Sequence, residues 1–164
     1  MSETRRIADQ LERAFEGEAW HGPSLREVLA QVTAPRAAAR PIPSAHTIGE
    51  IAAHVAAWED AVRRRLEGEL VELSEAQDWP RIDDTGEAAW KALLARLEAG
   101  NRALRATILA FDESRLDEPP GRNRSTAYRL MHGIIQHDIY HAGEINRLRG
   151  LRRASDAWAF EQYG

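Results

Sequence analysis

The feature that most constrains the fold of this chain is a helical repeat of apolar side chains in four long segments. Apolar residues recur three and four positions apart near residues 3–17, 47–68, 84–111 and 125–149, which is the period of an amphipathic helix. No segment shows the strict alternation of apolar and polar residues that is typical of a half-buried strand to a comparable degree. We therefore predict an all-α protein, a four-helix bundle that forms one domain over residues 1–164.

The second of these segments has the clearest start. Thr47-Ile-Gly-Glu50 fits a capping box, in which the threonine and glutamate side chains each accept a hydrogen bond from a free backbone N–H group. That start fixes the register of the helix and places His54 and Trp58 on its buried stripe. The connection that follows, over residues 69–84, is longer than the usual joint between antiparallel helices, so it permits a crossover.

Composition excludes several classes of function. Cysteine is absent from the sequence, which excludes a disulfide scaffold, a thiol nucleophile and thiolate metal ligands. The net charge of −4 does not favour nucleic acid as a partner. No run approaches the ~18 apolar residues that a membrane span needs, and the first residues lead into an amphipathic helix rather than an apolar signal core. We expect a cytoplasmic protein with neither nucleic acid nor membrane as a partner.

Three histidines are the candidate metal ligands. His137 and His141 are four residues apart in the last predicted helix, so both imidazoles lie on one face about a turn apart. His54 adds a third inward imidazole from another helix, and helix bundles often build metal sites from facing helices. Three nitrogen ligands without an obvious fourth would leave an open coordination position. The remaining histidines are weaker candidates, expected to be partly exposed polar residues: His21, His46 and His132.

Metal-bound histidines usually donate their second ring nitrogen to a carboxylate or a carbonyl. Four residues are candidates for that role, and each has a plainer alternative. Asp138 and Glu144 suit flanking solvated charges, Glu50 suits the capping box, and Asn101 suits a polar residue that sets the register of a bundle core. The residue after His137 is not the glutamate that zinc metalloproteases use as a general base, so the pair does not indicate a peptidase.

At this level of detail the chain resembles the DinB-like superfamily of bacterial metal-binding four-helix bundle proteins. The similarity covers most of the chain and is carried by three segments: Trp20-His-Gly-Pro-Ser24 with Leu29, Thr47-Ile48 through His54 to Trp58, and Gln136-His137-Asp138-x-x-His141-x-Gly143-x-Ile145. Members of the family often have glutamine where this chain has Glu144, a difference that leaves the three histidines intact but changes the local charge.

The resemblance implies an up-down-down-up bundle with a long crossover between the second and third helices. It also implies a frequent homodimer and a divalent metal held at the positions of His54, His137 and His141. Zinc or nickel is expected first, with iron or copper as alternatives, because all suit imidazole ligands. For the dimer interface we predict the second, partly apolar side of the last helix, at Ile135, Ile139 and Ala142.

The activities that the resemblance implies are transfer reactions and isomerisations that use low-molecular-weight bacterial thiols. A bound metal lowers the pKa of a coordinated thiol, and since the chain has no cysteine the sulfur would come from a cofactor. We therefore predict a metal-dependent S-transferase that acts on a small-molecule substrate. Two alternatives stay open, namely a metal-dependent hydrolase that uses activated water and a non-catalytic, metal-stabilised dimeric bundle.

Overall fold

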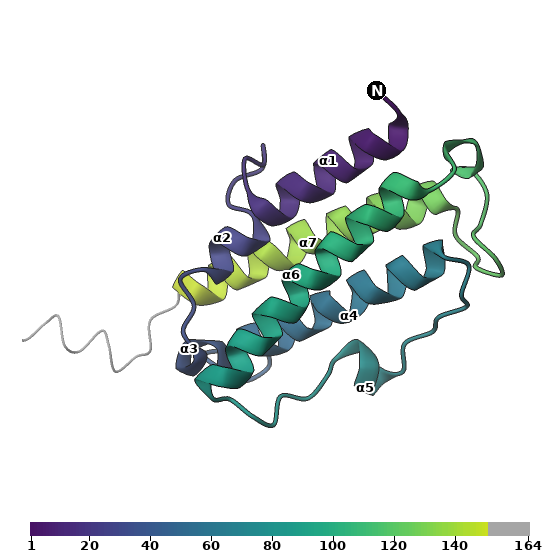
Figure 1. The fold of residues 1–164 in the computed structure, drawn as a ribbon. Helices are drawn as coiled ribbons and strands as arrows, with labels where there is room; N and C mark the ends of the chain where they lie inside the picture. The colour runs from purple at the N-terminus through teal and green to yellow at the C-terminus, as the bar shows by residue number, and fades with distance from the viewer. Residues whose placement is uncertain (151–164) are drawn as a thin grey trace, which may run out of the picture.

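A computed structural model of the chain describes residues 1–150, and over that range it is helical, with no strand. This confirms the all-α prediction. Figure 1 shows four long helices lying alongside one another, with three short helices and one 3₁₀ turn in the connections. In chain order the elements are α1 (Glu3–Glu16), α2 (Leu25–Leu29), α3 (Ala34–Ala38), α4 (Ile48–Leu66), α5 (Glu75–Asp78), α6 (Glu87–Ala110), η1 (Glu113–Arg115) and α7 (Ala127–Gly150).

The long helices pack through four main contacts. Helix α4 packs against α6 and α7, and α1 packs against the same two helices. The short helices α2 and α3 lie against α7 and α4, respectively. Helices α4 and α7, which carry the three candidate histidines, are therefore direct neighbours.

The helix starts follow from local capping, and two of them lie later in the chain than the sequence predicts. Helix α6 begins at Glu87 rather than near Asp84, because the Asp84 carboxylate accepts a hydrogen bond from the backbone N–H of Gly86 (2.8 Å) and forms a turn ahead of the helix. Helix α7 begins at Ala127 rather than near residue 125. The Thr126 hydroxyl accepts from the backbone N–H of Arg129 (3.2 Å) and so caps the first turn.

A layer of buried polar residues separates two apolar clusters in the core. One cluster includes Val55 of α4, Leu97 of α6 and Ala142 of α7. The other includes Val62, Leu104 and Ile134 from the same three helices. Each helix places one polar residue between its two apolar contributions, and all three side chains are fully buried: Glu59, Asn101 and Asp138.

The connection between α4 and α6 is long and is held against α4 at two places. Near its start, the Arg65 guanidinium donates two hydrogen bonds to the carbonyl of Val71 (2.9 and 2.7 Å). Further along, α5 contacts α4, and Trp79 packs against the apolar cluster that contains Val55. The segment therefore covers one side of α4, where His54 lies.

The predicted dimer face is wrong. Ile135 and Ala142 are both buried within the chain, at 8% and 2% exposure, and Ile139 packs against the apolar cluster around Ile134. Their apolar character is explained by contacts of α7 with α1 and α4 inside the same chain. Ile135 and Ala142 are therefore not available to a second copy.

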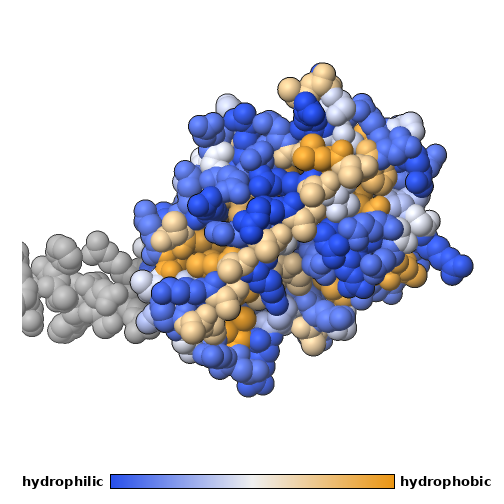
Figure 2. Space-filling view, viewed as in Figure 1, coloured by the Kyte–Doolittle hydropathy of each residue, from blue (hydrophilic) through white to orange (hydrophobic). Residues whose placement is uncertain are grey.

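Much of the visible surface is hydrophilic, and a diagonal band of moderately hydrophobic residues follows the direction of α6, with smaller strongly hydrophobic patches on either side of it (Figure 2). The exposed side of α6 carries a repeat of alanines at spacings of three and four: Ala88, Ala92, Ala95, Ala99, Ala103, Ala106 and Ala110. Small side chains thus form a stripe along the outer face of this helix. Within residues 1–150, no helix is both long and apolar enough to cross a membrane.

Candidate metal centre

The position of His54 follows from the start of α4. The Thr47 hydroxyl accepts a hydrogen bond from the backbone N–H of Glu50 (3.1 Å), and the Glu50 carboxylate accepts one from the backbone N–H of Thr47 (2.8 Å). The predicted capping box is therefore present and sets the register of the helix. In that register His54 faces inward and is only 5% exposed.

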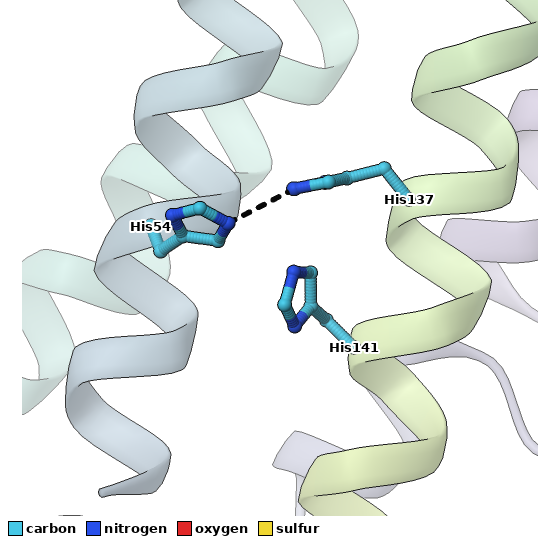
Figure 3. A group of neighbouring side chains, drawn as sticks. All are labelled: His54, His137 and His141. Carbon is cyan, nitrogen blue, oxygen red and sulfur yellow. Dashed lines mark hydrogen bonds between the residues drawn. The ribbon is translucent and has the colours of Figure 1, made fainter. Parts of the chain in front are cut away.

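The structure brings His54, His137 and His141 together. Figure 3 shows His54 on α4 facing His137 and His141 on α7. One ligand nitrogen of each histidine lies within 4.8 Å of the others, and the Nε2 atoms of His54 and His137 are 3.0 Å apart. The His137 side chain keeps 24% of its surface exposed, against 7% for each of the other two. Solvent therefore reaches the cluster on the side of His137.

Hydrogen bonds fix two of the rings by their Nδ1 atoms. His54 Nδ1 lies 2.7 Å from the carbonyl oxygen of Asp78, and His141 Nδ1 lies 2.6 Å from the Glu144 carboxylate. Because carbonyl and carboxylate oxygens only accept, both Nδ1 atoms carry the proton in a neutral ring. The Nε2 lone pairs are then free for a ligand bond, which is the usual arrangement of metal-binding histidines.

His137 lacks such a partner for its second nitrogen. Its Nδ1 atom is buried and forms no hydrogen bond within the described chain, and the nearest carboxylate oxygen, Oδ1 of Asp138, is 3.7 Å away. Its Nε2 atom points toward His54. Two nitrogens bound to one tetrahedral zinc ion at the usual bond length lie about 3.3 Å apart. The observed 3.0 Å separation is close to that value, so His54 and His137 are spaced as two ligands of one ion would be.

The surroundings keep the imidazoles neutral. Burial lowers the pKa of His54 and His137, and it lowers the pKa of His141 to about 4, with a further contribution from the neighbouring His137. Removing an imidazole from water disfavours its charged form. At neutral pH all three rings are therefore in the neutral form that binds metal ions.

Trp79 forms one wall of the centre. Its ring stacks on His54 at 3.9 Å and on His46 at 3.6 Å, with interplanar angles of 7° and 5°. The Trp58 indole donates a hydrogen bond to Oδ1 of Asp78 (2.5 Å) and lies beside His137, with ring centroids 5.8 Å apart. The connection between α4 and α6 thus contributes Asp78 and Trp79 to the site. Neither residue was predicted from the sequence to belong there.

The other histidines lie outside the cluster, as predicted. His46 contacts the far face of Trp79 and lies 3.4 Å from the Glu50 carboxylate. His132 packs against the ring of Tyr128, and His21 is exposed in the connection after α1. None of the three joins the ligand group formed within residues 1–150.

Asp138 fills neither of the two roles considered for it, since it forms no hydrogen bond with a histidine ring of the described chain. Rather than a flanking solvated charge, it is a fully buried residue facing Glu59 of α4, and burial raises the pKa of both carboxyl groups well above the usual range. Asn101 donates a hydrogen bond to Glu59 (2.6 Å), in line with its expected place in the core. Glu144 is likewise more than a solvated charge, since it accepts from His141.

These observations define a helical protein with a mostly buried cluster of three neutral imidazoles between two long helices. A family model described as the DinB superfamily matches residues 19–145, a span that includes all three histidines. The chain belongs to the DinB superfamily. Searches among curated proteins and among solved structures found no match.

Proposed function

We propose that His54, His137 and His141 bind one divalent metal ion through their Nε2 atoms. The observation that carries this proposal is the convergence of three neutral imidazoles from α4 and α7, two of them held by oxygen acceptors at Nδ1. Zinc or nickel is the first expectation for an all-imidazole site, and iron or copper would also suit it.

We further propose that the protein is a metal-dependent S-transferase for a low-molecular-weight thiol. A divalent ion in this position would hold a coordinating thiol as thiolate near neutral pH. The sequence has no cysteine, so the sulfur must come from a separate molecule, and the exposed side of His137 is its route to the centre. In the reaction a sulfur–carbon bond forms, the electrophile's leaving group departs with its bonding pair, and the thiol proton passes to solvent.

The residues of the chain orient the site for this chemistry. Asp78 and Glu144 fix the rings of His54 and His141 by hydrogen bonds. Trp79 covers His54 and excludes water from that side. Trp58 supplies a flat apolar surface beside His137, where a bound molecule can lie.

The test compares metal-loaded protein with metal-free protein on a panel of thiols and electrophiles. Mass spectrometry of the conjugate, together with loss of free thiol, should show turnover only when metal and thiol are both present. The His54→Ala variant should be inactive. Cleavage of esters or amides without added thiol would favour the hydrolase alternative, and metal binding without either reaction would favour a metal-stabilised bundle.

Three further structural expectations belong to the same proposal. We propose that the four long helices follow the up-down-down-up course, with the connection between α4 and α6 as the crossover. We also propose a single domain and a homodimer. The dimer must use a surface other than the buried side of α7, and sedimentation that gives one clean species of about 18.4 kDa at micromolar concentration would count against it.

A further inference from the structure

A basic pocket lies at the end of α4, between the segment that follows this helix and the turn that precedes α7. Its volume is about 440 Å³, and its lining includes Arg65, Arg122, Arg124 and one opposing carboxylate, Glu72. Arg122 and Arg124 are exposed and form no ion pair or hydrogen bond with any residue from 1 to 150. Two guanidinium groups in a concave surface are therefore available to a ligand.

The turn that carries these arginines is built into the fold. Gly121 has φ 57° and packs so closely on Gly68 that a Cβ atom would lie 2.3 Å from the Gly68 carbonyl oxygen. The Asn123 amide donates to the carbonyl oxygens of Pro120 (2.7 Å) and Glu69 (3.0 Å). These contacts join the turn to the end of α4, so the positions of residues 122 and 124 do not depend on a ligand.

Arg65 connects the pocket to the candidate metal centre. Its Nε and Nη2 atoms are held by the Val71 carbonyl, and its Cζ lies 5.2 Å from the centroid of the Trp58 ring. Trp58 in turn lies beside His137. A single indole ring therefore separates the Arg65 guanidinium from a proposed metal ligand.

Helix geometry gives the distance between the pocket and the histidines. Arg65 lies seven residues after Trp58 on α4, and Leu130, which also lines the pocket, lies seven residues before His137 on α7. Seven residues correspond to two turns, or about 10 Å along a helix. A small molecule of about that length would span the distance from the histidines to the arginines.

We propose that this pocket binds the acid group, a carboxylate or a phosphate, of the small molecule whose reactive end lies at the three histidines. The link to the histidines rests on the function proposed above. Guanidinium groups bind both acids with paired hydrogen bonds. A net charge of −4 and a pocket of about 440 Å³ favour a small anion over a nucleic acid.

The first experiment tests the pocket without metal. Inorganic phosphate and succinate are titrated separately into the metal-free protein, and the amide signals of residues 122–125 are followed by nuclear magnetic resonance. At least one of the two anions should give saturable shifts, and the preferred one identifies the acid class. In the double variant R122Q/R124Q binding should weaken by at least about tenfold, the effect of losing a charge-assisted hydrogen bond.

The matched control is R5Q/R96Q, which removes the same charge from exposed arginines outside the pocket. It should bind the anion as the wild type does. If neither anion saturates, or if both double variants weaken binding equally, the pocket is not a specific anion site and the proposal is wrong.

A second experiment tests the link to the histidines. With metal-loaded protein and an acid-bearing thiol, R122Q/R124Q should raise KM by at least about tenfold with little change in kcat. With the methyl ester of the same thiol, the variant should behave as the wild type does. Equal effects on both thiols would overturn the link. Failure of the transferase proposal would instead appear as absence of turnover in the wild type, with the anion titration unaffected.

Discussion

The Nε2 atoms of His54 and His137 lie 3.0 Å apart, although the two residues are separated by 83 positions in the chain and belong to different helices. The Nδ1 atom of His54 donates a hydrogen bond to the carbonyl oxygen of Asp78, so the lone pair of its Nε2 atom points at His137. Such a contact needs either a proton or a cation between the two rings. His141 completes the group within 4.8 Å and makes a cation the more fitting occupant.

Glu144 should strengthen metal binding because it orients His141. Its carboxylate lies 2.6 Å from His141 Nδ1. Loss of a hydrogen bond to a ligand histidine usually lowers metal affinity by about 10–100-fold. We therefore expect Glu144→Ala to lower the metal affinity by a similar factor, measured by competition with a chelating dye. Glu144→Gln keeps an acceptor oxygen and should lose less. Glu87→Ala, which removes an exposed charge from α6, should have no effect, and equal losses in Glu144→Ala and Glu87→Ala would refute the role.

The metal-free protein should lose stability in acid because His141 stays neutral in the folded state. Burial lowers the pKa of His141 to about 4, whereas a histidine in an unfolded chain has a pKa of about 6.5. Between these values the unfolded chain binds the additional proton, so the free energy of unfolding falls as pH decreases from about 6.5 to about 4.

Urea unfolding of wild type and His141→Asn across this window measures the effect. The free energy of unfolding of the variant should depend less steeply on pH. The difference between the two slopes should correspond to at most about one proton. His54 and His137, whose pKa values are also lowered by burial, remain in both proteins. Identical slopes for the two proteins would rule out this account of His141.

Asn101 should stabilise the buried polar layer of the bundle. It donates to the fully buried Glu59, and Asn101→Ala would leave that oxygen without a partner. An unsatisfied buried polar group costs about 1–3 kcal/mol, and we expect a loss of that size in the free energy of unfolding. Asn146→Ala, at an exposed position of α7, should change stability by no more than about 0.5 kcal/mol. If the two variants were equally stable, the layer would not contribute as described.

The sequence predicted the parts of the structure that depend on local periodicity. The Thr47–Glu50 capping box sets the register of α4, and the four-residue spacing of His137 and His141 sets their common face. Together these local rules identified all three histidines that the structure brings together. They did not identify the α4–α6 connection as part of the centre, because the stacking of Trp79 on His54 depends on a tertiary contact without a periodic signal.

The same limit explains the errors on α7. Ile135 and Ala142 form a second apolar side, which fits either a dimer interface or a helix packed on several neighbours, and the contacts with α1 and α4 decide for the latter. For Asp138 the sequence suggested either an acceptor for a metal-bound histidine or a solvated charge, because carboxylates seldom lie in a core without a partner. Its partner, Glu59, is on another helix and has no sequence motif that would reveal the pairing.

The most direct test of the metal centre is the metal content of untagged protein, measured by elemental analysis after equilibration with zinc or nickel. The wild type and His21→Ala, which changes an exposed histidine outside the cluster, should each hold about one ion per chain. His54→Ala, His137→Ala and His141→Ala should each hold far less. Full metal content in His54→Ala would contradict a centre shared between α4 and α7.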